Sequence, residues 1–255
     1  MLALQPLFSG SSGNAVLVAD KEHSFLVDAG VSGKRIIAAL SAYRKTISSI
    51  DAIFITHDHI DHILSAGILS RRYHIPIFAN APTWEAMLPI IGEIPAAQRR
   101  VIAEGEKLTF GEVTVETFSV PHDAAAPVGY TFCKGNRKVT VATDIGKMSE
   151  KLFLSLSGSD EILLESNYDI VMLQKGKYPY SLKRRISGER GHLSNKEAAA
   201  CCARLASLGT KNIILGHLSK ENNTPELAYE IARHYIEACG LVVGRDVKLS
   251  VAPRG

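Results

Sequence analysis

The sequence predicts a single α/β domain over residues 1–255, and three observations favour that class. A chain of 255 residues is long enough to bury one large core without disulfides. Short apolar strand patterns alternate with helical patterns along most of its length. No repeat, low-complexity tract or linker divides it.

Short apolar runs between turn residues predict the strands. They span residues 4–8, 15–18, 25–28, 52–56, 75–78, 113–120, 129–133, 138–143, 161–165 and 212–216. The first three follow one another across turns at residues 9–14 and 21–23, which predicts an antiparallel opening. Residues 52–56 lack alternation, which indicates a strand buried on both faces.

Start signals and periodicity predict the helices. Apolar residues at helical spacing favour helices over about residues 34–43 and 63–73. Ser194 and Glu197 form a capping-box pattern, which predicts a helix that runs to about Leu208. The pair Thr224-Pro225 places a proline in the first turn of the last helix.

Composition indicates a soluble, cytoplasmic protein without a membrane partner. The chain is 46% hydrophobic and 22% charged, and no apolar run approaches the ~20 residues that span a bilayer. The first residues lack the basic segment and small-residue cleavage site of a secretion signal. The cysteines show no C-x-x-C spacing, so we expect buried, reduced thiols at Cys133, Cys201, Cys202 and Cys239.

Positive charge is concentrated in one segment. The net charge of +3 is too small to indicate nucleic-acid binding by itself. Residues 175–190, however, hold six Lys or Arg against one Glu, a local charge of +5, with Tyr178 and Tyr180 between the cations. Cations suit phosphates and aromatic rings suit bases, so this segment favours contact with a nucleic acid over a solvated basic loop.

The strongest chemical signal lies at the end of the predicted strand 52–56. Three histidines, His57, His59 and His62, stand there with Asp61. In an extended loop His57 and His59 project to the same side, and a turn into a helix brings the other two beside them. Imidazole suits Zn, Mn or Fe, whereas Ca and Mg sites are built mainly from oxygen. One loop can therefore serve two metal ions.

Three more ligand-type residues each follow a predicted strand. They are His122, Asp144 and His217. A ligand at a strand end is held rigidly, and the sites of α/β sheets lie along such an edge. In combination these residues favour a metal centre over a chance gathering of surface histidines. Three other histidines are not expected to bind metal: His23, His74 and His234.

The chain resembles the metallo-β-lactamase superfamily, whose His-x-His-x-Asp-His signature stands here at residues 57–62. The three later ligand-type residues match that family's later ligands in order, and the resemblance covers nearly the whole chain. It implies a four-layer αββα sandwich. It also implies one metal ion on His57, His59 and His122, a second on Asp61, His62 and His217, and Asp144 bridging the two.

Other segments resemble the YycJ/WalJ group of bacterial proteins within that superfamily. They are residues 9–14, 164–169, 178–183 and 191–195. This resemblance implies a DNA exonuclease that works from 5′ ends with zinc or manganese, iron being a further option. Tyr168 departs from the group, in which a histidine often stands at that position.

The predicted chemistry is phosphodiester hydrolysis by a hydroxide bridging two divalent ions. We expect Asp61 to orient the water as well as bind metal. His192 either contacts a phosphate or leaving oxygen or has a structural role, and the two interpretations are equally supported. The turn at residues 9–14 either approaches the site or only closes a hairpin, and the hairpin is preferred. Candidate nucleic-acid contacts are Ser11, Asn167, Tyr180, Lys183, Arg184, Arg185 and Ser194.

Three alternative functions stay open. A thioester or lactone hydrolase would use the same ligands without needing a basic, aromatic surface, and its rate would respond little to salt. A short RNA-processing nuclease and a non-enzymatic metal-dependent binding module are the other two. The sequence leaves open the identity of the metal, the choice between DNA and RNA, the strand polarity, the choice between exo- and endo-cleavage, and the oligomeric state.

Overall fold

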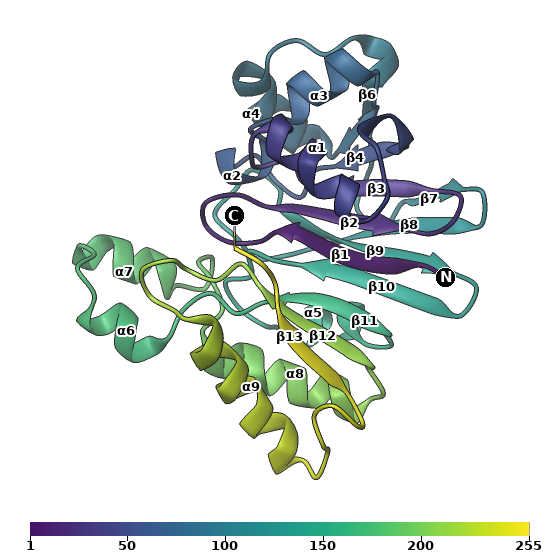
Figure 1. The fold of residues 1–255 in the computed structure, drawn as a ribbon. Coiled ribbons are helices and arrows are strands. Elements are labelled where there is room, and N and C mark those ends of the chain that lie inside the picture. Colours follow the sequence, from purple (N-terminus) through teal and green to yellow (C-terminus); the bar gives the residue numbers. More distant parts are fainter. Residues whose placement is uncertain (255) are drawn as a thin grey trace.

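Two β-sheets packed face to face form the centre of the molecule (Figure 1). The computed structural model describes residues 1–254. The first sheet contains, in order, β1 (Ala3–Phe8), β2 (Ala15–Ala19), β3 (Ser24–Val27), β4 (Ala52–Phe54), β5 (Ile77–Ala79) and β6 (Arg99–Val101). The second contains, in order, β7 (Lys107–Phe110), β8 (Val113–Ser119), β9 (Val128–Lys134), β10 (Arg137–Ala142), β11 (Glu161–Glu165), β12 (Asn212–Gly216) and β13 (Lys248–Val251).

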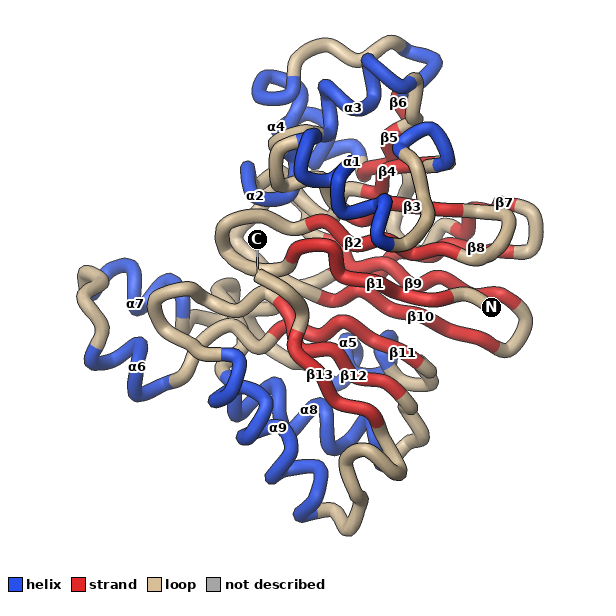
Figure 2. The backbone as a smooth tube through the Cα atoms, in the orientation of Figure 1, coloured by secondary structure: helices blue, strands red, loops and turns tan. Residues whose placement is uncertain are grey.

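Helices cover the outer face of each sheet and complete four layers (Figure 2). Those beside the first sheet are α1 (Gly33–Ala42), α2 (Ile60–Ile63), α3 (Ala66–Tyr73) and α4 (Ala81–Ile91). Those beside the second are α5 (Glu150–Leu156), α8 (Asn195–Ser207) and α9 (Pro225–Ala238). Short 3₁₀ helices occupy Ile47–Ser49 and Ala96–Gln98. The predicted αββα arrangement is confirmed.

Two further helices project from the side of the sandwich (Figure 1). They are α6 (Ile170–Lys175) and α7 (Tyr180–Ile186), and residues 170–186 are called the α6–α7 arm below. The basic segment at residues 175–190 therefore contains a helix, α7, and is not a loop throughout. Across residues 1–254, no helix is both long enough and apolar enough to cross a bilayer.

Three apolar cores fill the three interfaces between the layers. Side chains alternate between the faces of a strand, so Leu26 of β3 packs toward the helices while Phe25 and Val27 pack toward the second sheet. Aromatic rings are frequent between the sheets, and Phe25 stacks on Phe132 with ring centroids 5.5 Å apart. Burial of one such side chain stabilises the fold by about 1.5–3 kcal/mol, so the alternation decides how the layers stack.

Each sheet changes from antiparallel to parallel along its width. In the first sheet β1, β2 and β3 are antiparallel, as predicted, and β3 to β6 are parallel. In the second sheet β7 to β10 are antiparallel and β10 to β13 are parallel. The carboxyl ends of parallel strands meet at one edge of their sheet, which is where α/β folds place ligand sites.

The helix predicted over residues 63–73 is confirmed from Ala66 onward, and a separate short helix, α2, precedes it. α2 ends at Ile63 and α3 begins at Ala66. Between them, the N–H of Ser65 donates to the Ala29 carbonyl (2.8 Å) and its hydroxyl donates to the Val31 carbonyl (2.7 Å). These tertiary hydrogen bonds hold the junction against the loop that follows β3.

An ion pair between a half-buried lysine and a buried carboxylate joins the two sheets where β2 and β9 end. Asp20 Oδ2 accepts a hydrogen bond from Lys134 Nζ (2.7 Å), while Oδ1 accepts from the backbone N–H groups of Glu22 and His23. Burial acts to raise the pKa of Asp20, but these hydrogen bonds lower the pKa from 3.8 to about 2. The ionised carboxylate is therefore stabilised by folding.

Asp20→Asn is expected to lower the free energy of unfolding by about 1–3 kcal/mol at neutral pH, because a charged acceptor of three hydrogen bonds is lost. The folded pKa lies below the ordinary value, so this stabilisation is complete above about pH 4 and disappears as the pH falls through about 2. Denaturant unfolding at several pH values measures both effects. Glu112→Gln is the control, because its 76% exposed carboxylate contacts the same lysine. Equal losses in the two variants would contradict the prediction.

Candidate metal centre

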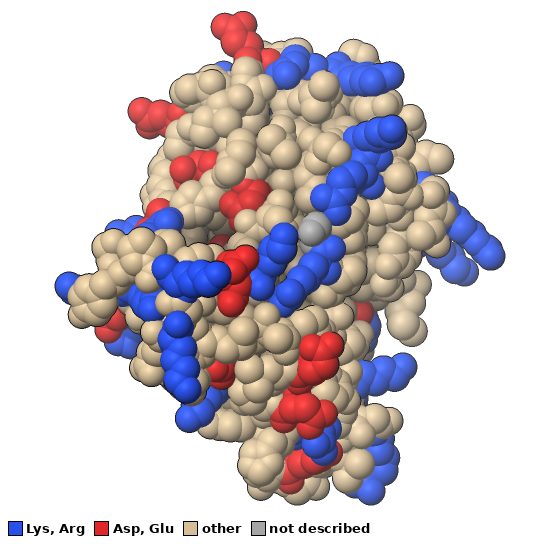
Figure 3. Space-filling view, turned by 60° about the vertical axis from the view of Figure 1, so that its left-hand side comes forward, with Lys and Arg blue, Asp and Glu red and all other residues tan. Residues whose placement is uncertain are grey.

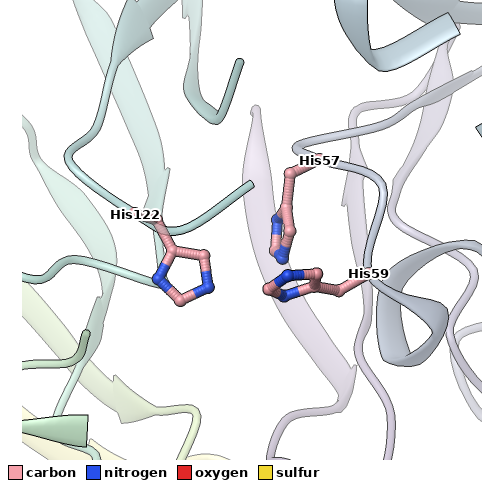
Figure 4. A group of neighbouring side chains, drawn as sticks. All are labelled: His57, His59 and His122. Atoms are coloured by element: carbon pink, nitrogen blue, oxygen red, sulfur yellow. The ribbon is translucent and has the colours of Figure 1, made fainter. Parts of the chain in front are cut away.

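Three histidines face one another across the edge of the sandwich (Figure 4). His57 and His59 lie on the loop that follows β4, and His122 follows β8. Their ring centroids are 4.6 Å (His57 to His59), 5.2 Å (His57 to His122) and 5.1 Å (His59 to His122) apart. One nitrogen from each ring lies within 4.8 Å of the others, so the three side chains could hold a single ion.

A second group forms directly beside the first. Asp61 and His62 lie on α2, and His217 follows β12. Asp61 Oδ2 lies 3.6 Å from Nε2 of both His62 and His217. The first sheet therefore supplies two members and the second sheet supplies one.

Asp144 lies between the two groups. Its Oδ1 is 3.6 Å from His122 Nε2 and 3.5 Å from His217 Nε2, while its Oδ2 is 3.3 Å from His62 Nε2. The Asp144 side chain is 3% exposed. All seven residues predicted as ligands are thus brought together at one place.

Three residues at this edge have a backbone conformation that is unusual for side chains other than glycine. Asp28, Asp144 and His217 have φ values of 64°, 59° and 53°, and each comes one or two residues after a strand. Such a conformation costs on the order of 1 kcal/mol or more and persists only where the surroundings impose it. The surrounding structure at this edge therefore holds the three residues in place despite the strain in their backbone.

Each buried histidine of the two groups has its Nδ1 held by the protein. A carboxylate, carbonyl or hydroxyl oxygen beside Nδ1 accepts a hydrogen bond from the Nδ1–H, which leaves the lone pair on Nε2, the nitrogen that faces the group. The pairs are His62 with Asp28 Oδ2 (2.7 Å), His217 with Glu165 Oε1 (2.9 Å), His122 with the Gly191 carbonyl (2.9 Å) and His57 with Thr56 Oγ1 (3.0 Å). These contacts fix the orientation of four imidazoles without a bound metal ion.

Several buried atoms at the centre have no hydrogen-bond partner within residues 1–254. They are Nε2 of His57, His122 and His217 and Oδ2 of Asp144. Buried polar atoms in proteins are almost always paired, so four orphaned atoms at one place need an explanation. Divalent cations would satisfy all of them, and a mixed imidazole and carboxylate set suits zinc or manganese. The donor set therefore fits metal ions.

Cation binding at the centre is linked to proton release. Burial, followed by the charges of neighbouring histidines, lowers the pKa of His57 well below its usual value, so this imidazole is neutral. Burial acts to lower the pKa of His62 as well, but three carboxylates, led by Asp28, raise the pKa to about 9. Burial acts to raise the pKa of Asp144, but the surrounding histidines lower it. An incoming cation thus meets an ionised carboxylate and displaces a proton from His62.

Two carboxylates that orient ligands were not identified from the sequence. Asp28 follows β3 and holds His62, as described above. Glu165 ends β11, is fully buried, and accepts from Nδ1 of both His192 (2.8 Å) and His217 (2.9 Å). Both stand at the end of a predicted strand, which is the signal that could have found them.

His192 lies at the rim of the centre. Its ring centroid is 4.9 Å from that of His122 and 5.3 Å from that of His217, and its side chain is 19% exposed. Because Glu165 holds Nδ1, the other ring nitrogen is the one available for a substrate. His192 therefore has access to whatever binds at the centre.

The turn at residues 9–14 closes the β1–β2 hairpin and also reaches the centre, so the prediction that it only closes a hairpin is wrong. Ser9 Oγ accepts from the N–H of His217 (2.8 Å), and Asn14 Nδ2 lies 3.0 Å from His62 Nε2. Ser11, at the tip of the turn, is exposed. The turn thus positions two ligands of the second group.

The other predicted nucleic-acid contacts have different surroundings. Four of them line one cavity beside the α6–α7 arm: Tyr180, Lys183, Arg184 and Ser194. Arg185 instead pairs with the Asp123 carboxylate, next to His122. Asn167 is buried, and its Nδ2 donates to the His217 carbonyl (2.8 Å), which positions that ligand.

The remaining histidines lie outside both groups, and the cysteines are unpaired. His23 lies beside Asp51, His74 lies beside Gln98, and His234 is exposed on α9. All four cysteines are free, as predicted, but only Cys201 and Cys202 are buried. Cys239 is exposed and Cys133 is half-buried, so their predicted burial is wrong.

Gly30 lies against the backbone that carries two ligands. A Cβ at this position would lie 1.6 Å from the Asp61 carbonyl oxygen, which is not a tolerable contact. Gly30→Ala is therefore expected to displace the turn at residues 61–62, to lower the metal content and to cost about 1–3 kcal/mol of stability. Elemental analysis of the purified protein and thermal unfolding measure the two effects.

Gly33→Ala is the matched control for this change. Its nearest neighbour would be the flexible Leu69 side chain at 3.2 Å, so that side chain can move aside. This variant should keep its metal. A Gly30→Ala protein with the same metal content and the same melting temperature as Gly33→Ala would show that the close approach has no functional consequence.

Residues 23–218 match the family profile described as the β-lactamase superfamily domain. The chain belongs to the metallo-β-lactamase superfamily. Within it, the chain is 42% identical over 243 residues to exodeoxyribonuclease YycJ of Bacillus anthracis, covering 95% of this chain and 92% of that protein. It is 40% identical over 245 residues to exodeoxyribonuclease WalJ of Streptococcus pneumoniae, covering 95% and 91%. This metallo-β-lactamase-fold protein is thus a member of the YycJ/WalJ-like group, as its motifs predicted.

Solved structures of the superfamily share the fold. Zn²⁺-bound PqqB from Methylobacterium extorquens aligns with a TM-score of 0.74 at 17% identity, covering 100% of this chain and 98% of that one. YhfI from Bacillus subtilis aligns with a TM-score of 0.73 at 16% identity, covering 100% and 98%. At such identities the likeness concerns the superfamily fold and not the activity.

Proposed function

We propose that the chain is a metal-dependent deoxyribonuclease that removes nucleotides from the 5′ ends of DNA. The observation that carries the proposal is the convergence of seven ligand-type side chains from two sheets, with buried Nε2 atoms that lack partners among residues 1–254. The relatives YycJ and WalJ bear the name exodeoxyribonuclease, which supports DNA as the substrate. The 5′ polarity follows the resemblance to their group.

In this proposal the first ion is held by His57, His59 and His122, and the second by Asp61, His62 and His217. Asp144 would contact both. Zn²⁺ or Mn²⁺, with iron as a further option, would lower the pKa of a water molecule and polarise the phosphoryl oxygen. The protein keeps the ligands oriented through Asp28, Glu165 and the Gly191 carbonyl.

Two side chains handle protons in the proposed reaction. Asp61 is 22% exposed through its side chain, so its carboxylate can accept a hydrogen bond from the attacking water and orient it. His192 is fixed at Nδ1 by Glu165, and its Nε2 can deliver a proton to the leaving oxygen. Asp61 would thus act on the attacking water, and His192 on the leaving oxygen.

The α6–α7 arm would hold the DNA strand. Lys and Arg side chains gather over the face of the molecule that carries the arm (Figure 3). Lys183 and Arg184 of α7 contribute to this charge, and Tyr180 is 75% exposed. Cations bind phosphates, and exposed aromatic rings stack on bases. The free cysteines agree with a cytoplasmic location, where thiols stay reduced.

Incubation of the protein with end-labelled single- and double-stranded DNA and RNA, with Mn²⁺ or Zn²⁺, tests the function. Metal-dependent release of mononucleotides from the 5′ end of DNA is expected, and a chelator should stop it. Hydrolysis of a neutral thioester or lactone with no action on any polynucleotide would contradict the proposal and favour a small-molecule hydrolase.

Salt dependence gives an independent check. Three phosphate contacts to a single strand predict a slope of about −2 for log affinity against log salt concentration, since each contact releases counterions. Hydrolysis of a small neutral ester would show almost no slope. A flat response on DNA would therefore exclude the arm as the strand-binding surface.

A further inference from the structure

A cavity of about 730 Å³ lies between the α6–α7 arm and the start of α8. This volume falls within the range of pockets that bind small molecules. The metal ligands are not among its lining residues. It is therefore a separate hollow from the proposed metal centre, although the two are close together.

The backbone connects the cavity to the metal centre. Tyr168 and Ser194 line the cavity and pair with each other as a parallel bridge. The preceding residue, Asn167, donates to the His217 carbonyl, and His192 stands two residues before Ser194. Two extended residues span about 7 Å, which is similar to the length of one nucleotide in an extended strand. A strand with a phosphate at the centre can therefore place an adjacent base in the cavity.

The walls combine apolar surface with an aromatic ring at the entrance. Ile170, Leu173 and Tyr168 supply apolar surface, and Leu173 and Tyr168 are buried. Tyr180 also lines the cavity, and 75% of its surface is exposed. An aromatic ring left so open to water forms no part of a core, whereas it suits stacking against a flat ligand ring.

The charge at the cavity suits a phosphate-bearing ligand. Three cations line it, namely Lys183, Arg184 and Lys196. The side chains of Arg184 and Lys196 make no hydrogen bond or ion pair with any residue in the range 1–254. The one lining carboxylate, Glu197, is engaged by the Ser194 N–H and hydroxyl at 3.0 and 2.7 Å. Two cations therefore remain available to a ligand.

We infer that this cavity binds one unpaired nucleobase of the DNA strand, next to the scissile phosphate, with Tyr180 stacked on the base and Arg184 and Lys196 on adjoining phosphates. The inference rests on the proposed nuclease function and extends it to substrate selection. A paired base cannot enter without leaving its helix, which costs a few kcal/mol per base. The protein therefore selects single-stranded or frayed ends.

The test crosses one protein change with one substrate change. The protein change is Tyr180→Ala, and the substrate change is a base-free tetrahydrofuran nucleotide, placed in turn at successive positions from the 5′ end of an oligothymidylate. With Mn²⁺ present, Tyr180→Ala should raise KM on the intact strand by about 5- to 100-fold. At one position the missing base should raise KM for the wild type by a similar factor. On that strand Tyr180→Ala should cause no further rise.

Two variants control for stacking and for the loss of an exposed tyrosine. Tyr180→Phe retains an aromatic ring and should behave as the wild type. Tyr43→Ala removes a 40% exposed tyrosine at the end of α1, outside the arm and the cavity, and KM should stay unchanged. If Tyr180→Ala raises KM by the same factor on the intact strand and on every base-free strand, the inference is overturned.

Failure of the proposed function would look different from failure of the cavity inference. A wild-type protein that cleaves none of these strands with Mn²⁺ or Zn²⁺ overturns the nuclease proposal. Fluorescence anisotropy with the same oligonucleotides then still tests the cavity, because base-dependent binding that is lost in Tyr180→Ala needs no cleavage. Binding that ignores both the base and Tyr180 overturns the cavity inference alone.

Discussion

Asp144→Ala is expected to reduce DNA hydrolysis by at least about 10³-fold, because metal ions supply several kcal/mol of transition-state stabilisation and each 1.4 kcal/mol is worth a factor of ten. Among residues 1–254, Asp144 is the one carboxylate that lies close to ligands of both groups, 3.6 Å from His122 Nε2, 3.5 Å from His217 Nε2 and 3.3 Å from His62 Nε2. Without it, the imidazoles of the two groups lose the carboxylate that lies between them. Both ions should then be lost or displaced.

Metal content and rate together measure the effect of this change. Elemental analysis should show fewer bound ions per chain than in the wild type, and single-turnover hydrolysis of single-stranded DNA should be slow even with added Mn²⁺. Circular dichroism should still report a folded protein. Asp20→Asn is the matched control, since it removes a buried carboxylate between the sheets at a site remote from the ligands. An Asp144→Ala protein with full activity and no added metal would show that the reaction does not need this centre.

Glu165→Gln is expected to lower metal affinity by about 10- to 100-fold and stability by about 2–4 kcal/mol, although the two side chains have almost the same shape. Glu165 Oε1 accepts from Nδ1 of His192 and His217, and Oε2 accepts from the N–H groups of Ile145 and Leu193. All four partners are donors. An amide NH₂ in either position must therefore face two donors.

Either orientation of the new amide is unfavourable. If the NH₂ group faces the imidazoles, His217 can accept only by moving its proton to Nε2, which removes the lone pair that faces the cations. If it faces the backbone, two buried N–H groups lose their acceptor. Isothermal titration with Zn²⁺ measures the loss of metal affinity, and denaturant unfolding of the metal-free protein measures the loss of stability.

Glu161→Gln is the matched control, because this buried carboxylate begins the same strand. Its partners are Arg137 on Oε2 and Asn212 on Oε1, so an amide can keep one of the two hydrogen bonds. Some stability should be lost, but metal affinity should not change. If Glu165→Gln behaves like Glu161→Gln in both measurements, the orientation of the histidines does not depend on the buried carboxylate.

The ligand set could be predicted from sequence because its physics is local. His57, His122, Asp144 and His217 each follow a strand by one to three residues, and the ends of strands that run the same way collect at one edge of a sheet. The strands themselves follow from short apolar runs between turn residues. Alternation of side chains then fixes which residues fill each core.

The elements that were missed depend on tertiary contacts. α4 contains Pro89 in its interior, which argues against a helix, yet its N-cap Asn80 and the packing of Trp84 and Met87 stabilise it. α7 buries no side chain, so it shows no apolar stripe. The orienting roles of Asp28 and Glu165 depend on which imidazole lies beside each carboxylate, and only the folded chain determines that.

The ligands of the metal centre come from both sheets, whereas the Asp20–Lys134 pair links the same sheets elsewhere. Chelation would release only one of these two cross-links. Amide hydrogen exchange should then accelerate first around residues 55–62 and 215–219, while the ends of β2 and β9 remain slow to exchange. Bound ions would thus stabilise one edge of the sandwich against local unfolding, and the concentration of free metal would set how often that edge unfolds.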